Sequence, residues 1–170
     1  TYITKNADKT AWPAPTDYVA SRYELIARIW ASNASYYNGT SAYEALNRTF
    51  LLYDLTGDTN ELDLNHRLYP TTYPKPSEWL TYIDGTEAQR ATIATSARNY
   101  FLGLINFILN SADSRVPANL KTAFQTYGPS VYELRDSSGV SPQLYVREAR
   151  RLVGDYVLTK EVAIVASNYA

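Results

Sequence analysis

The sequence predicts a mainly α-helical protein with a minor β component, an α+β segment that forms a single domain over residues 1–170. Apolar residues recur at three- and four-residue spacing in several stretches, as in amphipathic helices. A capping box, Thr86-Glu87-Ala88-Gln89, precedes the longest of these stretches. Clear β-branched runs occur only near the C-terminus, and no internal repeat divides the chain.

Two long helices follow from the apolar periodicity. The first comes after Pro13-Ala14-Pro15 and is predicted over 17–32, where apolar residues form one stripe. The second opens on the capping box and is predicted over 87–110. At 1.5 Å per residue this second helix is about 36 Å long, enough to form the spine of the domain.

The remaining elements are shorter. Helices are predicted at 118–126, after Pro117, and from Pro142 to about Gly154. A helix at 41–49 runs into Phe50-Leu51-Leu52-Tyr53, which is either its continuation or a strand. Strands are predicted at 156–158 and 162–165. Residues 54–77 contain three prolines and no sustained periodicity, which predicts a long loop, ordered because it carries many apolar residues.

Composition excludes several functions. The formal net charge of -1 provides no positive field for a phosphate backbone, so nucleic-acid binding is not expected. The absence of Cys excludes thiolate zinc sites and iron–sulfur clusters, and a single His excludes His-pair metal motifs, so no metal site is expected. No apolar run approaches the roughly 18 residues that a membrane-spanning helix needs, so no membrane span is expected.

Other features suggest an extracellular protein. Three N-x-S/T sequons, at Asn33, Asn38 and Asn47, crowd one short region and are candidate glycosylation sites. The chain has 16 Tyr but no oxidisable Met or Cys, which suits an oxidising compartment. Because no Met is present, we expect the sequence to be a processed or excised piece of a longer product.

The 54–77 stretch holds a first group of candidate binding residues, Asn60, Asp63, Asn65 and His66. The acidic residues here invite a calcium interpretation, but their spacing does not follow the EF-hand loop, and a solvated acidic loop is the simpler alternative. His66 lies away from any apolar stripe, so it either meets a ligand or serves as a surface hydrogen-bonding residue.

A second group lies in the run from Pro142 to Thr159. On a helix, Arg147, Arg150 and Arg151 would lie within one turn of each other. Three guanidinium groups at that spacing repel one another unless anions meet them. Glu148 and Asp155 can satisfy part of this charge, and a bound phosphate, carboxylate or reduced flavin would satisfy the rest.

The run Pro142–Thr159 resembles a late signature of FAD-dependent oxidoreductases. Looser similarity, in the same order, covers 22–25, 57–65, 99–104 and 113–117. The resemblance implies a larger α/β enzyme in which a Rossmann-like domain holds FAD and a helical region covers the flavin and shapes the substrate site. This chain would be that helical, substrate-side region.

The family's glycine-rich FAD fingerprint is missing from this chain, because its seven glycines never fall two apart. The resemblance therefore implies that FAD is held mainly by polypeptide outside this sequence, either the remainder of the same oxidoreductase or a partner chain. The chain alone would not be active.

The implied chemistry is hydride transfer from a substrate carbon to flavin N5. We assign Arg147 and Arg150 to the stabilisation of negative charge on reduced flavin or on an anionic substrate. Gln143 and Tyr145 are assigned as positioning hydrogen-bond partners, with Asn60, Asp63, Asn65 and His66 next. No residue is assigned a catalytic role.

Two other functions fit the composition. One is a non-enzymatic secreted module that binds a glycan or a protein through its tyrosines and the 54–77 stretch. The other is a carbohydrate-active hydrolase or lyase built on a pair of carboxylates or tyrosines. A small molecule or a carbohydrate is the expected substrate in the enzyme interpretations.

Overall fold

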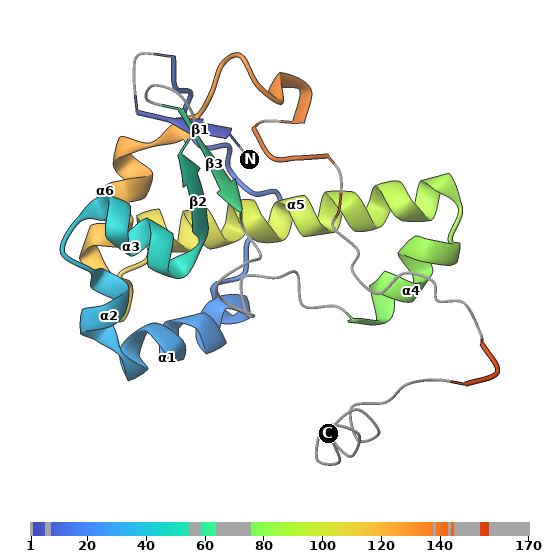
Figure 1. The fold of residues 1–170 in the computed structure, drawn as a ribbon, viewed down its shortest axis with the longest axis horizontal. Helices are drawn as coiled ribbons and strands as arrows, with labels where there is room; N and C mark the ends of the chain where they lie inside the picture. Colours follow the sequence, from blue (N-terminus) through green and yellow to red (C-terminus); the bar gives the residue numbers. More distant parts are fainter. Residues whose placement is uncertain are drawn as a thin grey trace, which may run out of the picture.

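The computed structural model describes residues 2–5, 8–54, 59–63, 76–137, 139–142, 144 and 154–156. In this part of the chain, most helices and a small sheet gather around one end of a long helix (Figure 1). The helical elements are η1 (Ala20–Tyr23), α1 (Glu24–Ser32), α2 (Ala34–Asn38), α3 (Ala42–Thr49), α4 (Pro76–Asp84), α5 (Glu87–Asn110), α6 (Ala118–Thr126) and η3 (Arg135–Ser137). The strands are β1 (Tyr2–Thr4), β2 (Leu51–Asp54), β3 (Thr59–Asp63) and β4 (Gly128–Pro129).

The mainly helical fold class with minor β structure is confirmed. The four described strands form one antiparallel sheet in the order β2-β3-β1-β4. Its register pairs Leu52 with Leu62 and places Ile3 between Asn60 and Pro129. Ile3 and Leu62 are buried and belong to the hydrophobic core, so they connect the sheet to it. The sheet therefore joins three segments that are distant in the sequence.

Helix α5 begins and ends where the sequence predicts. The backbone N–H of Gln89 donates to Thr86 Oγ1 at 3.3 Å, and the backbone N–H of Thr86 donates to Gln89 Oε1 at 2.8 Å, which completes the capping box. The predicted helix at 118–126 is also confirmed, as α6. Helix α6 packs against α5, α3 packs against α6, and α4 lies near the N-terminal end of α5 (Figure 1).

The first predicted helix is shorter than expected. Residues 17–19 are not helical: Val19 has an extended backbone, and a 3-10 turn precedes α1. Asp17 instead accepts a hydrogen bond of 2.9 Å from the Arg22 guanidinium, which holds the lead-in outside the helix. At the other end, α1 stops at Ser32 and Asn33 is the N-cap of the next helix, α2. The Asn33 side chain accepts a hydrogen bond from the Tyr36 N–H.

The region after α3 corrects the predicted loop. The helix at 41–49 is confirmed, with Ser41 as its cap, and the Phe50–Tyr53 alternatives resolve in favour of a strand, β2. A single loop over 54–77 is wrong, since β3 lies within it and α4 begins at Pro76. Strand β3 carries little apolar patterning, but β1 and β2 pair with it on both sides and complete its backbone hydrogen bonds.

The C-terminal elements fall largely outside the described residues. This holds for most of the predicted helix from Pro142 to Gly154 and for the strands at 156–158 and 162–165. Pro142, Leu144, Gly154 and Tyr156 are described, and none of them lies in a helix or strand.

The aromatic core centres on Tyr23. Its ring packs 5.5 Å from the Phe107 ring, and its hydroxyl donates to the backbone carbonyl of Tyr100 at 3.0 Å. A Cβ on Gly103 would lie only 2.1 Å from this hydroxyl, so the close approach of η1 to α5 requires glycine. Burial raises the pKa of Tyr23 and raises that of Tyr100 to about 12, which keeps both hydroxyls protonated.

Replacing Gly103 with Ala should therefore lower the free energy of unfolding by about 1–3 kcal/mol, because the new methyl group displaces the Tyr23 hydroxyl. Tyr23→Phe should cost about 0.5–1.5 kcal/mol through the lost hydrogen bond. Chemical denaturation of both single variants and the double variant measures the coupling between the two positions. Gly103→Ala should cost less in the Tyr23→Phe background; additive effects would contradict the proposed steric cause.

Candidate functional site

The structure places only some of the sequence-predicted binding residues. Gln143, Tyr145, Arg147, Arg150, Asn65 and His66 lie outside the described residues. Asn60 and Asp63 lie on β3, where Asn60 pairs with Ile3 and Asp54, and Asp63 pairs with Leu51. These two residues therefore belong to an inner strand of the sheet and not to a loop.

The candidate glycosylation residues lie at one corner of the fold. Asn33 separates α1 from α2, Asn38 ends α2, and Asn47 lies within α3. The short helix α2 connects the other two, so the three sequons remain near one another in the folded chain (Figure 1). Their settings differ in exposure and in hydrogen bonding.

Three of the segments that carry the family resemblance meet in space. We call residues 22–25, 99–104 and 113–117 the motif junction. Tyr23 of the first segment contacts the second segment: its hydroxyl donates a hydrogen bond to the Tyr100 carbonyl, and its ring packs against Gly103. Arg115 of the third segment donates to both carboxylate oxygens of Glu24, at 3.0 and 2.8 Å. One hydroxyl and one guanidinium thus join residues that are 77 and 91 positions apart in the sequence.

The two carboxylates of the motif junction, Glu24 and Asp113, are both paired with guanidinium groups. Arg115 also donates to Asp113, at 2.9 Å to Oδ1 and 2.6 Å to Oδ2, while Arg28 donates to Glu24 at 2.8 Å. The hydrogen bonds from Arg115, and then from Arg28, lower the pKa of Glu24 from 4.5 to about 2. The hydrogen bonds from Arg115 also lower the pKa of Asp113.

These contacts suit the motif junction to a structural role. Both carboxylates stay ionised near neutral pH, so neither can act there as a general acid, and their oxygens already accept hydrogen bonds from guanidinium groups. A bidentate guanidinium–carboxylate pair fixes relative orientation as well as distance. The junction therefore ties the start of α1 to the connection between α5 and α6. The sequence indicated these segments through their resemblance, but it did not indicate that they pair.

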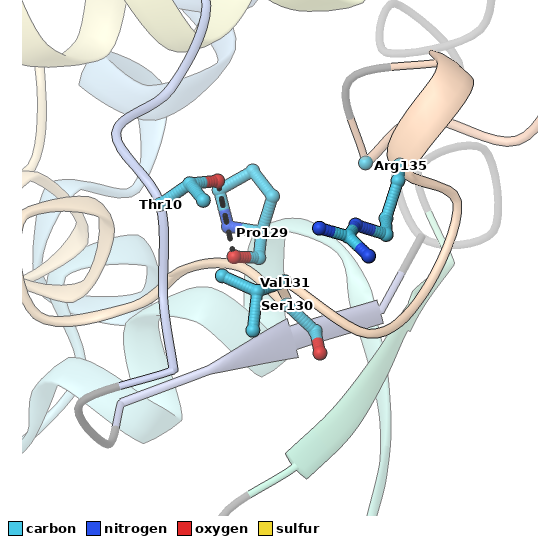
Figure 2. Close-up of a pocket in the computed structure, with 6 residues that line it drawn as sticks. Thr10, Pro129, Ser130, Val131 and Arg135 are labelled. Atoms are coloured by element: carbon cyan, nitrogen blue, oxygen red, sulfur yellow. Dashed lines mark hydrogen bonds between the residues drawn. The ribbon is translucent and has the colours of Figure 1, made fainter.

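A small hollow of about 200 Å³ opens beside β4. It is lined by Thr10, Pro129, Ser130, Val131, Arg135 and Gly139. Figure 2 shows the Arg135 side chain extending from η3 toward Pro129 and Val131, and the Thr10 hydroxyl bonded to the Pro129 carbonyl. Gly139 has φ +80°, and a Cβ there would lie 2.4 Å from Pro129 Cβ, so only glycine allows this turn to pack on β4.

A family model described as FAD dependent oxidoreductase matches residues 2–168. The chain belongs to the FAD-dependent oxidoreductase family. The match includes the motif junction, the 54–77 stretch and the arginine run from Pro142 to Thr159. No curated protein and no solved structure matches the chain.

Family membership implies FAD, but the described part of this oxidoreductase chain does not fit a dinucleotide. The Rossmann-type site needs a glycine-rich turn between a parallel strand and a helix, whereas the described sheet is antiparallel throughout. The hollow beside β4, at about 200 Å³, is smaller than the roughly 300–1,000 Å³ of typical ligand pockets. No step of flavin chemistry can be built from these residues.

The described residues form neither a metal site nor a membrane-spanning helix. Within the described ranges, no three His, Cys, Asp or Glu side chains gather in a way that could hold a metal ion. None of the described helices of this oxidoreductase chain combines the length and apolar character needed to cross a bilayer.

The lowered pKa values predict how the motif junction responds to acid. Because the folded-state pKa values of Glu24 and Asp113 lie below their ordinary values, their stabilisation is fully present above about pH 4.5 and is lost as the pH falls toward about 2. Arg115→Gln should therefore be less stable than the wild type at neutral pH, and the difference should shrink over this window. Denaturant titrations across the pH range measure it. Arg90→Gln, at an exposed position on α5, is the control and should show no such window; a pH-independent effect of Arg115→Gln would contradict the ionic cause.

Proposed function

We propose that this chain is the helical, substrate-side part of a secreted FAD-dependent oxidoreductase, where it covers the flavin and shapes the substrate site. One observation carries the proposal: the family model spans residues 2–168, yet none of the seven glycines has the spacing of a dinucleotide-binding turn. The sheet among the described residues is antiparallel, which also supports a dinucleotide site formed by other polypeptide. FAD would then be held mainly by the remainder of the same oxidoreductase or by a partner chain.

In this arrangement the flavin supplies hydride acceptance, and the chain supplies orientation and charge. The arginine run is the best source of that charge. Arg147, Arg150 and Arg151 are three cations, whereas Glu148 and Asp155 are two nearby anions, so one guanidinium is left over. Elsewhere in the described chain, Arg22, Arg28, Arg48 and Arg115 are each paired with a carboxylate.

We assign the stabilisation of reduced flavin or of an anionic substrate to Arg147 and Arg150. Gln143 and Tyr145 would position the bound molecule through hydrogen bonds. Asn60, Asp63, Asn65 and His66 would contribute further polar contacts to a small-molecule or carbohydrate substrate. The family match covers all eight positions and supports this assignment.

Secretion is the second part of the proposal. It is supported by the three clustered sequons and by the absence of Met and Cys beside 16 Tyr. The described corner of the fold that carries the sequons is formed by α1, α2 and α3.

The role of the arginine run predicts a shift in flavin potential. In the purified native assembly, Arg147→Ala should make the midpoint potential about 30 mV more negative, equivalent to about 1.4 kcal/mol for a two-electron couple, because a cation that favours the reduced form is removed. Reductive titration against a reference dye measures this without knowledge of the substrate. Arg90→Ala removes a guanidinium from the exposed surface of α5 and should leave the potential unchanged.

The same samples decide between functions. Absence of flavin from the native assembly would overturn the oxidoreductase assignment, and an unchanged potential in Arg147→Ala would overturn the role of Arg147 in stabilising reduced flavin. Cleavage of a polysaccharide without any bound cofactor would indicate a hydrolase or lyase. Polysaccharide binding without redox activity would indicate a non-enzymatic module.

A further inference from the structure

The three sequons differ in how the fold presents them. An N-glycosylation acceptor needs its Asn amide and its Ser or Thr hydroxyl on the surface, typically in a loop. Asn33 lies between two helices, Asn38 is the last residue of α2, and Asn47 lies inside α3. From this difference we infer that Asn33 is the N-glycosylation site of the chain and that Asn38 and Asn47 stay unmodified. The inference rests on the secretion that we propose above.

The Asn33 sequon is open throughout. Asn33, Ala34 and Ser35 are all exposed, and the Asn33 backbone, at φ −146° and ψ 66°, is outside the helical range. The Asn33 side chain uses its Oδ1 to accept from the Tyr36 N–H at 3.3 Å. Glycosylation modifies Nδ2 and leaves this carbonyl oxygen in place. A glycan at Asn33 is therefore compatible with the cap of α2.

The Asn38 sequon is held against α6. Asn38 is half-buried, and its Oδ1 accepts from the backbone N–H of Asn119 at 2.9 Å. The Asn119 amide donates in turn to the Gly39 carbonyl at 3.3 Å. The hydroxyl of Thr40, the third residue of the sequon, donates to Glu44 at 2.6 Å. The Asn38 amide is thus half-buried against α6, in contrast to the exposed Asn33, and the Thr40 hydroxyl that a transferase must engage already donates to Glu44.

The Asn47 sequon is closed by helix formation. Its third residue, Thr49, has 0% of its surface exposed, and the Thr49 hydroxyl is buried without a hydrogen-bond partner in the structure. Asn47 itself is half-buried in the middle of α3. Engagement of both groups would require α3 to unfold, so folding competes directly with modification at this position.

The modification at Asn33 is a transfer from a lipid-linked diphosphate oligosaccharide, the co-reactant class that the proposal requires. The Asn33 amide nitrogen forms a bond to C1 of the first sugar, and the bond between C1 and the diphosphate oxygen breaks. The amide loses one proton, and the lipid diphosphate is the leaving group. No oxidation or reduction occurs.

Glycopeptide mass spectrometry of the natural protein from its source tests the inference. Enzymatic removal of N-glycans in heavy-oxygen water marks each occupied Asn as labelled Asp. We expect label at Asn33 and none at Asn38 or Asn47. Absence of glycan at Asn33, or occupancy at Asn38 or Asn47 equal to that at Asn33, would overturn the inference.

Variants secreted from a glycosylating host separate acceptor loss from structural damage. Ser35→Ala destroys the acceptor but keeps Asn33 as the cap, and Asn33→Asp also keeps a capping oxygen. Each should change one glycan per chain to none, with a matching gain in gel mobility. Thr40→Ala is the control and should leave the glycan in place. A glycan that persists in Ser35→Ala and Asn33→Asp would overturn the inference.

Flavin content measured on the same protein keeps the two proposals distinct. A flavin-containing protein without glycan overturns the Asn33 inference and leaves the oxidoreductase assignment standing. A protein glycosylated at Asn33 but devoid of flavin supports this inference and overturns the enzyme assignment.

Discussion

The fold depends on the close contact between Tyr23 and α5. The hydroxyl of a large buried side chain reaches the Tyr100 carbonyl because Gly103 presents no side chain at that point. This contact sets the distance between η1 and α5, and the rings of Trp30 and Phe107 then stack within the space it leaves. A buried hydroxyl without a partner would be costly, so the hydrogen bond is part of the packing and not an addition to it.

Arg115 fixes the orientation of the same contact. Its two hydrogen bonds to Glu24 hold the first turn of α1, while those to Asp113 hold the connection that follows α5. A single ring contact would allow α1 to rotate about its own axis, whereas a bidentate pair to its first residue restricts that rotation. In this chain, the segments 22–25, 99–104 and 113–117 that resemble the oxidoreductase family therefore serve packing. The chemistry that we propose is accordingly assigned to the arginine run and not to the motif junction.

Local signals explain which elements the sequence predicted. Helix α5 has both a capping box and a sustained apolar pattern, and α6 follows a proline, so their ends could be read from a few neighbouring residues. Strand β3 has only Leu62 as an apolar member and is held by pairing with β1 and β2, a long-range cause that leaves no local pattern. The same cause explains why Asn60 and Asp63 were expected in a loop. The start of the first helix was predicted too early, because Asp17 accepts a hydrogen bond from Arg22 and Val19 has an extended backbone.

Burial differs between the two halves of α5, and the segment that leads to the arginine run contacts α5 between them. In the C-terminal half, Leu102, Gly103, Leu104 and Ile105 are buried in succession, so this half is covered on several sides. In the N-terminal half, Ile93 and Ala97 are buried and residues 87–92 are exposed.

The segment that leads to the arginine run attaches between these two halves. Arg98 of α5 donates to the Ser137 carbonyl at 3.0 Å, Val140 is buried, and Leu144 packs on the core. The run from Pro142 to Thr159 therefore starts beside a fixed part of the fold. A charged group that must meet a partner in one orientation needs such a support, because positional freedom at its base would weaken every contact it makes.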